Sequence, residues 1–426
     1  MKNNFITVFF IAFLFNSSVF SEETTTNAVF ANGGDISWLP EMEKESNFQF
    51  YNDNGVAQDC FQILKDHGIN TIRLRTWVNP NMTDWKNGHC STAETVAMAV
   101  RAQKWGMRVM IDFHYSDTWA DPSHQVKPAA WVGHDFATLL NDLYNYTYGV
   151  MTALNTAGVT PEWVQVGNET SGGMVYPEGS TSNWSQLAQL INKGYDAVKA
   201  VSPTTKVILH IDQGNNNSRF RNWFDNAKSY GAKYDVIGMS YYPYWLSGSP
   251  DYTLSINNLG ANLNDMVTRY GKEVMVVEVG GLDTNAQNTY EMLTAVINKV
   301  KVVPNNSGLG VIYWEPEGAR SWSGYALSAW GSNGRPTIAL NAFNNLTAID
   351  SPTESKLKMR QDIQNHTLNF DTYLSKIEII SMNGMKIESV SNTSSISTGN
   401  LIKGFYLIKT TITNSNNSTI FKFNCN

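Results

Sequence analysis

Two glutamates stand at the ends of short apolar segments and could form the carboxyl pair of a hydrolase. Glu169 follows Trp163–Asn168, and Glu278 lies near the end of Glu273–Val279, a run rich in β-branched residues. Both segments have the length and composition of buried strands. Hydrolysis of a glycosidic bond needs two carboxyl groups, one to protonate the leaving oxygen and one to attack or stabilise the sugar carbon. The pair therefore predicts a glycoside hydrolase.

The chain between Ala31 and Leu346 alternates short β-branched runs with longer stretches of helical period. The predicted strands are Phe30–Ser37, Asn70–Thr76, Arg108–Tyr115, Trp163–Asn168, Lys206–Asp212, Asp235–Tyr241, Glu273–Val279 and Gly310–Trp314. The predicted helices are Val56–His67, Thr92–Trp105, Phe136–Ala157, Trp184–Val201, Phe220–Tyr230, Ile256–Tyr270, Thr289–Val302 and one near Pro336–Asn344. Eight strand and helix pairs predict an α/β fold, a closed (β/α)8 TIM barrel. The two glutamates then lie on strands four and seven, and both face the barrel mouth.

Other predicted strands also carry polar residues toward this mouth. Arg73 and Arg75 are two residues apart on strand two, so both point to the same side. A guanidinium beside Glu278 would keep that carboxylate ionised as a nucleophile, and the spacing alone does not say which arginine does so. On strand three, Asp112 and His114 share a face in the same way.

The residues next to the strand ends suit a sugar site. Asn168 places an amide beside the first glutamate, where it could bind the sugar 2-hydroxyl. Ser240-Tyr241-Tyr242 closes strand six and could offer a phenol to the second glutamate. Trp314 ends strand eight, where an indole would form the floor of the central sugar site. Glu315 and Glu317 are rival carboxylates at the same strand end.

Several segments together resemble the family 53 glycoside hydrolases, the endo-β-1,4-galactanases. The resemblance covers about residues 31–346 and is carried by Gly34–Trp38, Ile63–Asn70, Ile72–Arg75, Asp112–Pro122, Val166–Glu169, Gly238–Pro243 and Val277–Val279. It implies an endo-acting, retaining hydrolase of β-1,4-galactan in pectin side chains, with Glu169 as acid/base and Glu278 as nucleophile. It also implies a set of substrate-binding residues, with Trp119 stacking on sugar in the groove: Arg73, His114, Asp117, Trp119, Asn168, Tyr242 and Trp314.

No cofactor or metal is predicted. Bacterial members of the family often have a long calcium-binding loop after strand seven, whereas Gly280–Tyr290 is short here. Two other functions remain open from the sequence. One is another retaining barrel, such as a β-mannanase or β-glucanase. The other is a catalytically dead barrel that only binds polysaccharide, which the presence of both carboxylates disfavours.

Composition and the amino terminus restrict partners and location. The 426-residue chain has a net charge of −6 and a pI near 5.7, so it lacks the basic surface that binding to nucleic acid requires. Residues 1–21 combine Lys2, the apolar run Phe5–Phe15 and small residues, which predicts a signal peptide and a secreted or cell-surface protein. No later run is long enough to span a bilayer. In an oxidising compartment, Cys60 and Cys90 are expected to form a disulfide.

The predicted barrel domain spans residues 22–346. After it, the alternation of strand and helix patterns stops. Residues 347–372 are mostly polar, and their apolar residues show little helical or strand periodicity, which indicates a linker. Residues 373–426 alternate short apolar runs with turns, and Asn383-Gly384 is a strong hairpin signal, so a small all-β module is predicted. This tail resembles the C-terminal sorting domain of Bacteroidetes-type secretion, although the expected upstream Tyr-Pro-Asn-Pro is missing. A partner in the secretion machinery is therefore one hypothesis, and a carbohydrate-binding or stalk module is the other.

Overall fold

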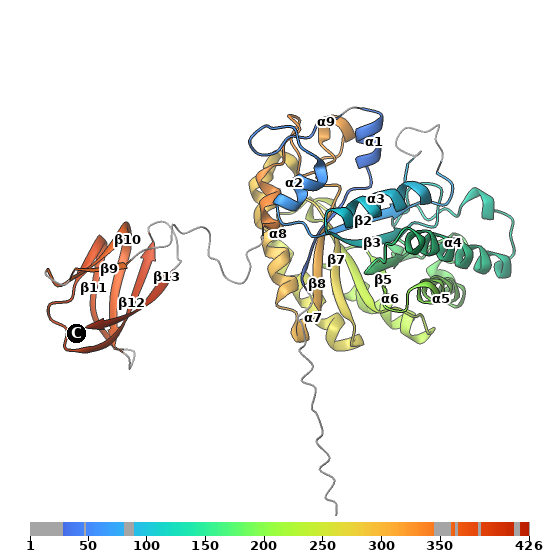
Figure 1. Ribbon diagram of the computed structural model, residues 1–426. Helices are drawn as coiled ribbons and strands as arrows, with labels where there is room; N and C mark the ends of the chain where they lie inside the picture. Colours follow the sequence, from blue (N-terminus) through green and yellow to red (C-terminus); the bar gives the residue numbers. More distant parts are fainter. Residues whose placement is uncertain are drawn as a thin grey trace, which may run out of the picture. The chain divides into compact units, whose positions relative to one another are not determined.

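The computed structural model describes residues 29–46, 48–80, 89–344, 359–362, 365–381, 385–412 and 418–425. The chain divides into two compact units, Met1–Asn345 and Leu346–Asn426 (Figure 1). Three predicted features lie outside the described residues: the signal peptide at 1–21, the linker as far as residue 358, and the turn at Asn383-Gly384.

Eight parallel strands form a closed barrel in sequence order. They are β1 (Ala31–Asp35), β2 (Thr71–Thr76), β3 (Arg108–Phe113), β4 (Trp163–Val166), β5 (Lys206–Ile211), β6 (Val236–Tyr241), β7 (Glu273–Val279) and β8 (Gly308–Trp314). Pairing of β1 with β8, in which Asp35 lies opposite Trp314, closes the ring. The predicted TIM barrel is confirmed.

Helices surround the strands and pack their apolar sides on the barrel (Figure 1). They are α1 (Leu39–Lys44), α2 (Cys60–Asp66), α3 (Thr92–Lys104), α4 (Phe136–Thr156), α5 (Trp184–Val201), α6 (Asn217–Ser229), α7 (Ile256–Tyr270), α8 (Ala286–Lys301) and α9 (Arg320–Ser323). The predicted last helix near Pro336–Asn344 is a 3-10 helix at Ile338–Phe343. Helices α1 and α9, which follow the first and last strands, lie at the top of Figure 1, so the barrel mouth is at that end.

Two apolar cores hold the barrel together. The larger core fills the layer between strands and helices. A smaller core plugs the barrel interior and includes Met110, Trp163, Ile208 and Met275. Because this plug fills the interior, a substrate can enter only at the mouth.

Capping residues set where the helices begin and end. Ser91 and Asp135 accept hydrogen bonds from the third backbone N–H of α3 and α4, at Glu94 and Thr138. Gly68 has a φ of +84° after α2, and a Cβ there would meet the Phe343 carbonyl oxygen. This left-handed glycine turns the chain from helix into strand.

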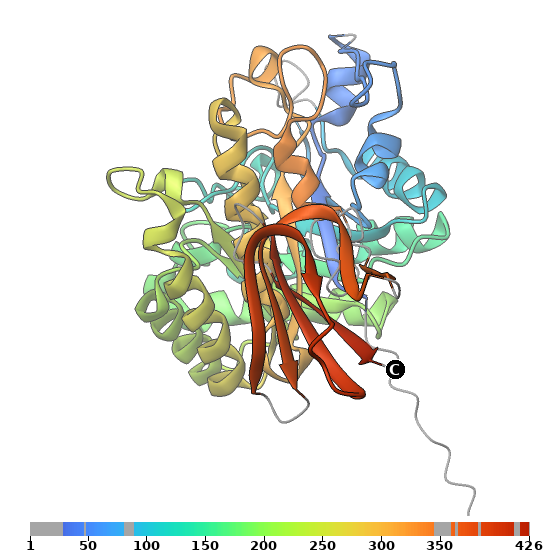
Figure 2. The same ribbon diagram turned by 90° about the vertical axis from the view of Figure 1, so that its left-hand side faces the viewer.

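The second unit is a five-stranded antiparallel sheet. Its strands are β9 (Met359–Asp362), β10 (Thr367–Ser381), β11 (Lys386–Ser397), β12 (Gly404–Ile412) and β13 (Ser418–Cys425), in the order β11-β10-β12-β13 with β9 beside β10. Figure 2 shows these strands, in red, side by side. Their core includes Leu368, Leu374, Ile377, Ile379 and Ile408.

The prediction of a linker over residues 347–372 is wrong in its second half, because β9 and the start of β10 lie within that range. Among the described residues, strand β9 pairs with the first residues of β10, and none of its residues is fully buried. An exposed edge strand has no need for alternating apolar residues, so the sequence pattern is absent there.

The disulfide predicted between Cys60 and Cys90 is also wrong, because both residues are buried free thiols. Cys60 belongs to the apolar layer between strands and helices. Cys90 lies beside Arg75 and 3.9 Å from the Ser37 carbonyl oxygen. Each thiol thus behaves as a small buried side chain. Within the described part of the chain, no helix has the length and apolarity needed to cross a membrane.

Candidate active site

Arg73 is the centre of a buried hydrogen-bond network at the carboxyl ends of the strands. Its guanidinium donates to five side chains from four other strands and their ends: Asp35, Asp112, Gln165, Asn168 and Glu278, at 2.6 to 2.9 Å. The arginine is fully buried. A buried guanidinium with this many acceptors is locked in one orientation, so it fixes the groups that it contacts.

Glu278 receives hydrogen bonds on both carboxylate oxygens. Arg73 Nη2 lies 2.9 Å from Oε1, and the Tyr242 hydroxyl lies 3.2 Å from Oε2. Burial raises the pKa of Glu278 to about 7, while Arg73 and the Tyr242 hydrogen bond act in the opposite direction. The structure thereby answers which arginine accompanies this glutamate: it is Arg73.

Glu169 has a different environment. Its backbone is left-handed, with φ 44° and ψ 51°, a costly conformation for a residue with a side chain. Its Oε1 accepts a 2.6 Å hydrogen bond from Ser240 Oγ. Burial raises the pKa of Glu169 well above the ordinary value, and the nearby charge of Glu278 raises it further. Of the two groups, Glu278 ionises first and Glu169 keeps its proton.

A histidine connects the network to Glu169. His210 Nε2 lies 2.8 Å from Ser240 Oγ, and because that hydroxyl donates to Glu169, the imidazole must donate to the serine. His210 Nδ1 then accepts from the Gln165 amide at 3.0 Å. Burial lowers the pKa of His210 well below its usual value, so the ring is neutral.

His114 is held in place by hydrogen bonds on both of its ring nitrogens. Its Nδ1 accepts from the Trp77 indole at 3.1 Å and from the Ala120 N–H at 3.0 Å. Nε2 therefore carries the proton and donates to Asp112 Oδ2 at 3.0 Å. The sequence predicted that Asp112 and His114 share a face, and the structure places them in contact.

Arg75 supports the aromatic side of the mouth. Its guanidinium lies 4.3 Å from the Trp119 ring centroid and is hydrogen-bonded to Glu315, which also accepts from the Trp38 N–H at 3.1 Å. Glu317 is fully buried, which raises its pKa well above the ordinary value. Neither of these two rival carboxylates lines the cavity described next, so neither is placed to touch a substrate.

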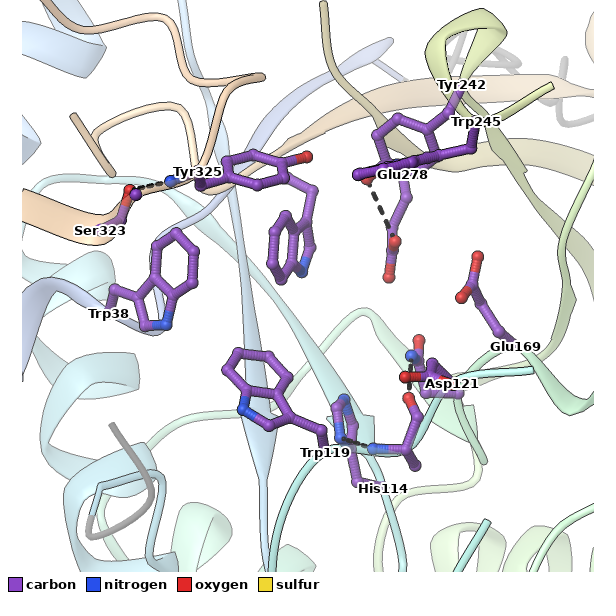
Figure 3. Close-up of a pocket in the computed structure, with 14 residues that line it drawn as sticks. Trp38, His114, Trp119, Asp121, Glu169, Tyr242, Trp245, Glu278, Ser323 and Tyr325 are labelled. Atoms are coloured by element: carbon purple, nitrogen blue, oxygen red, sulfur yellow. Dashed lines mark hydrogen bonds between the residues drawn. The ribbon is translucent and has the colours of Figure 1, made fainter. Parts of the chain in front are cut away.

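A cavity of about 490 Å³ opens at the barrel mouth between these groups. In Figure 3 the rings of Trp38, Trp119 and Tyr325 lie on the left of the cavity, and both glutamates, Glu278 and Glu169, lie on the right. The residues that line the cavity are Trp38, His114, Trp119, Ala120, Asp121, Asn168, Glu169, Tyr242, Trp245, Glu278, Trp314, Ser323, Gly324 and Tyr325. The rings of Trp38, Trp314 and Tyr325 pack edge to face at centroid distances of 4.9 to 5.8 Å. This wall gives flat apolar surface beside two carboxyl groups, the combination that a sugar chain requires.

The structure brings together all but one of the predicted site residues. Arg73 donates to Asn168 and Glu278, and the other seven line the cavity: Glu169, Glu278, His114, Trp119, Asn168, Tyr242 and Trp314. Asp117, for which the resemblance implies substrate binding, is not among the residues that line the cavity. Its two carboxylate oxygens accept from the Asn79 and Ala129 backbone N–H groups, at 2.9 and 2.8 Å. Asp117 thus ties two loops together.

The family model described as glycosyl hydrolase family 53 matches residues 31–350, most of the chain. The chain belongs to glycosyl hydrolase family 53. An arabinogalactan endo-β-1,4-galactanase of Thermothelomyces thermophilus is 34% identical over 298 residues, which cover 65% of this chain and 86% of the relative.

Solved structures agree with this family assignment. The catalytic domain of a family 53 enzyme from Ignisphaera aggregans has a TM-score of 0.67 and 29% identity, covering 74% of this chain and 95% of its own. A structure from a study of two fungal β-1,4-galactanases has a TM-score of 0.66 and 31% identity, covering 74% and 98%. This family 53 protein is therefore a glycoside hydrolase by sequence and by fold.

Several residues of the family 53 site were not predicted from the sequence. They are Asp35, Gln165, His210, Ser240, Trp38, Trp245 and Tyr325. Gln165 and His210 lie inside apolar strand runs, and a single polar residue that interrupts such a run was the available signal. The described residues include no group of three His, Cys, Asp or Glu side chains arranged to hold a metal ion.

Proposed function

We propose that this protein is an endo-β-1,4-galactanase that cleaves galactan by a retaining, double-displacement mechanism without a cofactor. The observation that carries the proposal is the unequal environment of two buried carboxyl groups on one cavity. Glu278 contacts Arg73 and Tyr242, whereas the Glu169 carboxyl group accepts a hydrogen bond from the neutral Ser240 hydroxyl. The substrate is assigned from relatives that are named as β-1,4-galactanases.

In the first step Glu278 acts as nucleophile and Glu169 as acid. The Glu278 carboxylate attacks the anomeric carbon of the sugar in the cavity, and Glu169 gives its proton to the glycosidic oxygen as that bond breaks. Arg73 and Tyr242 keep the attacking carboxylate in place and favour its charged form. The products of this step are a galactosyl ester of Glu278 and a free leaving sugar.

In the second step Glu169 acts as a base. Esterification removes the negative charge of Glu278, and that charge is one cause of the raised pKa of Glu169. The pKa of Glu169 therefore falls when the ester forms, so the carboxylate can take a proton from an incoming water. Attack of that water on the anomeric carbon releases Glu278 and restores the original configuration of the sugar.

Different residues of the cavity wall would contact the apolar faces and the hydroxyls of the sugar. The edge-to-face rings Trp38, Trp119 and Trp314 offer apolar surface to the faces of the galactosyl ring. Asn168 Nδ2 donates one of its two protons to the Ala120 carbonyl oxygen at 2.7 Å, so the second remains for a sugar hydroxyl, such as the 2-hydroxyl. His114 is fixed by its neighbours, and it presents its ring to the cavity.

The proposal is tested with Glu169→Gln and Glu278→Gln on linear galactan, with mannan and cellulose as comparison substrates. Wild-type protein should release short galacto-oligosaccharides from galactan and should not cleave mannan or cellulose. Each glutamine variant should lose most of this activity while melting at the wild-type temperature, since glutamine keeps the shape of the side chain. If both variants cleave galactan at the wild-type rate, the assignment of the pair is wrong. Binding of galactan without new reducing ends in the wild type would instead identify a binding protein.

We further propose that the protein is exported and that the C-terminal sheet engages secretion machinery. The support is the leader-like segment at residues 1–21 and the resemblance of the tail to a sorting domain. In the native host, full-length protein should reach the medium or cell surface. A chain that ends at residue 346 should remain in the cell and keep galactanase activity. Export of the shortened chain at the full-length level would refute the role of the sheet.

A further inference from the structure

The backbone that carries Glu169 turns sharply after β4. Gly167 has a φ of +86°, and a Cβ there would meet Thr170 Cγ2 at 2.6 Å. Two residues later Glu169 is itself left-handed, with φ 44° and ψ 51°. A residue with a side chain keeps this conformation only where surrounding contacts hold it. The position of the Glu169 carboxyl group therefore depends on the contacts made by the segment 167–170.

The peptide group between Asn168 and Glu169 is held at both of its ends. Its carbonyl oxygen accepts a hydrogen bond from Gln125 Nε2 at 2.8 Å, and its N–H donates a longer one to His210 Nδ1 at 3.4 Å. Gln125 lies in the loop after β3 and His210 lies on β5, the two strands that flank β4. Because this peptide group leads directly into Glu169, its orientation sets the direction of the Glu169 side chain.

Gln125 is buried, with 2% of its surface exposed. Its Nε2 also donates to the Asp121 carbonyl oxygen at 3.0 Å. Since both acceptors are carbonyl oxygens, the amide nitrogen must face them and Oε1 must point away. Oε1 is buried and has no hydrogen-bond partner among the described residues. A buried oxygen without a partner destabilises a fold, so its presence favours a role for the two donated bonds beyond stability.

The loop segment 120–125 holds Asn168 by both its side chain and its main chain. Asn168 Nδ2 donates to the Ala120 carbonyl oxygen at 2.7 Å, and the Asn168 carbonyl oxygen accepts from Gln125. The segment is closed by two backbone hydrogen bonds between Asp121 and His124, at 2.9 and 3.0 Å. A closed turn of this kind gives the Gln125 amide a fixed base from which to hold the peptide group before Glu169.

We propose that Gln125 is a positioning residue for proton transfer: its amide holds the Asn168–Glu169 peptide group so that the Glu169 carboxyl group reaches the glycosidic oxygen. The inference rests on the proposed function, because it takes Glu169 as the acid. Without the amide, the segment relaxes toward an ordinary backbone conformation and the carboxyl group moves away from that oxygen. Attack by Glu278 is affected less, since Arg73 and Tyr242 hold that carboxylate.

Two aryl β-galactobiosides separate proton transfer from attack. Dinitrophenolate leaves without a proton, whereas phenolate needs one from Glu169. With either substrate, kcat/KM measures the step that forms the ester of Glu278. In Gln125→Met, kcat/KM for the phenyl substrate should fall about 10- to 100-fold more than for the dinitrophenyl substrate, the effect of displacing a reacting group by about 1 Å. Gln125→Asn, whose amide is one methylene shorter, should change this ratio in the same direction by a smaller factor.

Gln103→Met is the matched control. It also removes a side-chain amide that donates to a distant backbone carbonyl, that of Gly158 at 2.9 Å, and Gln103 lies outside the cavity. Its ratio of the two kcat/KM values should equal that of the wild type. Glu169→Gln gives the ratio expected for complete loss of the acid.

A ratio that stays at the wild-type value in both Gln125 variants would overturn the proposal, whether or not the two rates fall. An equal fall on both substrates would show a loss of folded protein, which a lower melting temperature would accompany. If Glu169→Gln itself left the ratio unchanged, or if the wild type cleaved neither galactan nor the phenyl substrate, the proposed function would be refuted instead.

Discussion

Removal of the Ser240 hydroxyl should move the alkaline limb of the pH profile of kcat/KM to higher pH. Ser240 Oγ donates to Glu169 at 2.6 Å, a bond that favours the ionised carboxylate. A hydrogen bond to a charged group contributes about 1.5 to 3 kcal/mol. At about 1.4 kcal/mol per pKa unit, its loss in Ser240→Ala raises the pKa of Glu169 by roughly one to two units. Because Glu169 must be protonated to act as the acid, the enzyme stays active to higher pH.

Tyr242→Phe is the matched variant for the other carboxyl group. The phenol donates to Glu278 at 3.2 Å and favours its ionised form. Its loss raises the pKa of Glu278 from about 7, so the acid limb should move up while the alkaline limb stays. Initial rates on soluble galactan from about pH 4 to 10 measure both limbs. If Ser240→Ala moved the acid limb and Tyr242→Phe the alkaline limb, the two glutamates would have the opposite roles.

Three further predictions concern the surroundings of the site. Arg73→Lys should also move the acid limb to higher pH, whereas Arg75→Lys should lower the melting temperature and leave that limb unchanged; an equal effect of both on the limb would contradict the contacts described. His89 hydrogen-bonds Glu94 and Glu45, which raises its pKa, so the protonated ring stabilises the fold fully below about pH 6.5 and the gain is lost as pH rises through the higher folded value. Urea unfolding of His89→Gln should accordingly show a loss of stability at low pH that shrinks toward about pH 9, and a constant difference would exclude the ion pairs as its cause. Unfolding without reductant should expose three thiols to Ellman's reagent, whereas a single thiol would show that Cys60 and Cys90 are joined.

The sequence was sufficient to predict the barrel and most of the polar and aromatic residues at its mouth. Parallel strands buried on both faces appear as short β-branched runs, and polar residues at their ends can only face the mouth. Glu169 and Glu278 were placed at the mouth by this reasoning, and both line the cavity there. The sequence could not separate Arg73 from Arg75, because residues two apart on a strand share a face. Which arginine contacts Glu278 depends on acceptors from other strands. Gln165 and Asp112 accept hydrogen bonds from Arg73 and hold it in that position.

The predictions that failed depend on contacts between distant segments. The pairing of Cys60 with Cys90 was inferred from compartment and spacing, neither of which fixes the distance between two side chains. His210 and Ser240 were missed because their role exists only as a chain of hydrogen bonds ending on Glu169.

Covalent trapping tests the central claim, that Glu278 attacks the sugar carbon, most directly. A 2-deoxy-2-fluoro-β-galactobiosyl fluoride should form the ester quickly and hydrolyse it slowly, since the fluorine at C2 destabilises both transition states and the good leaving group restores only the first. Mass spectrometry of the digested protein should place one fluorogalactobiosyl group on the peptide that carries Glu278, and Glu278→Gln should remain unlabelled. A label on Glu169, or no label while the reagent is turned over to a product of inverted configuration, would contradict the account.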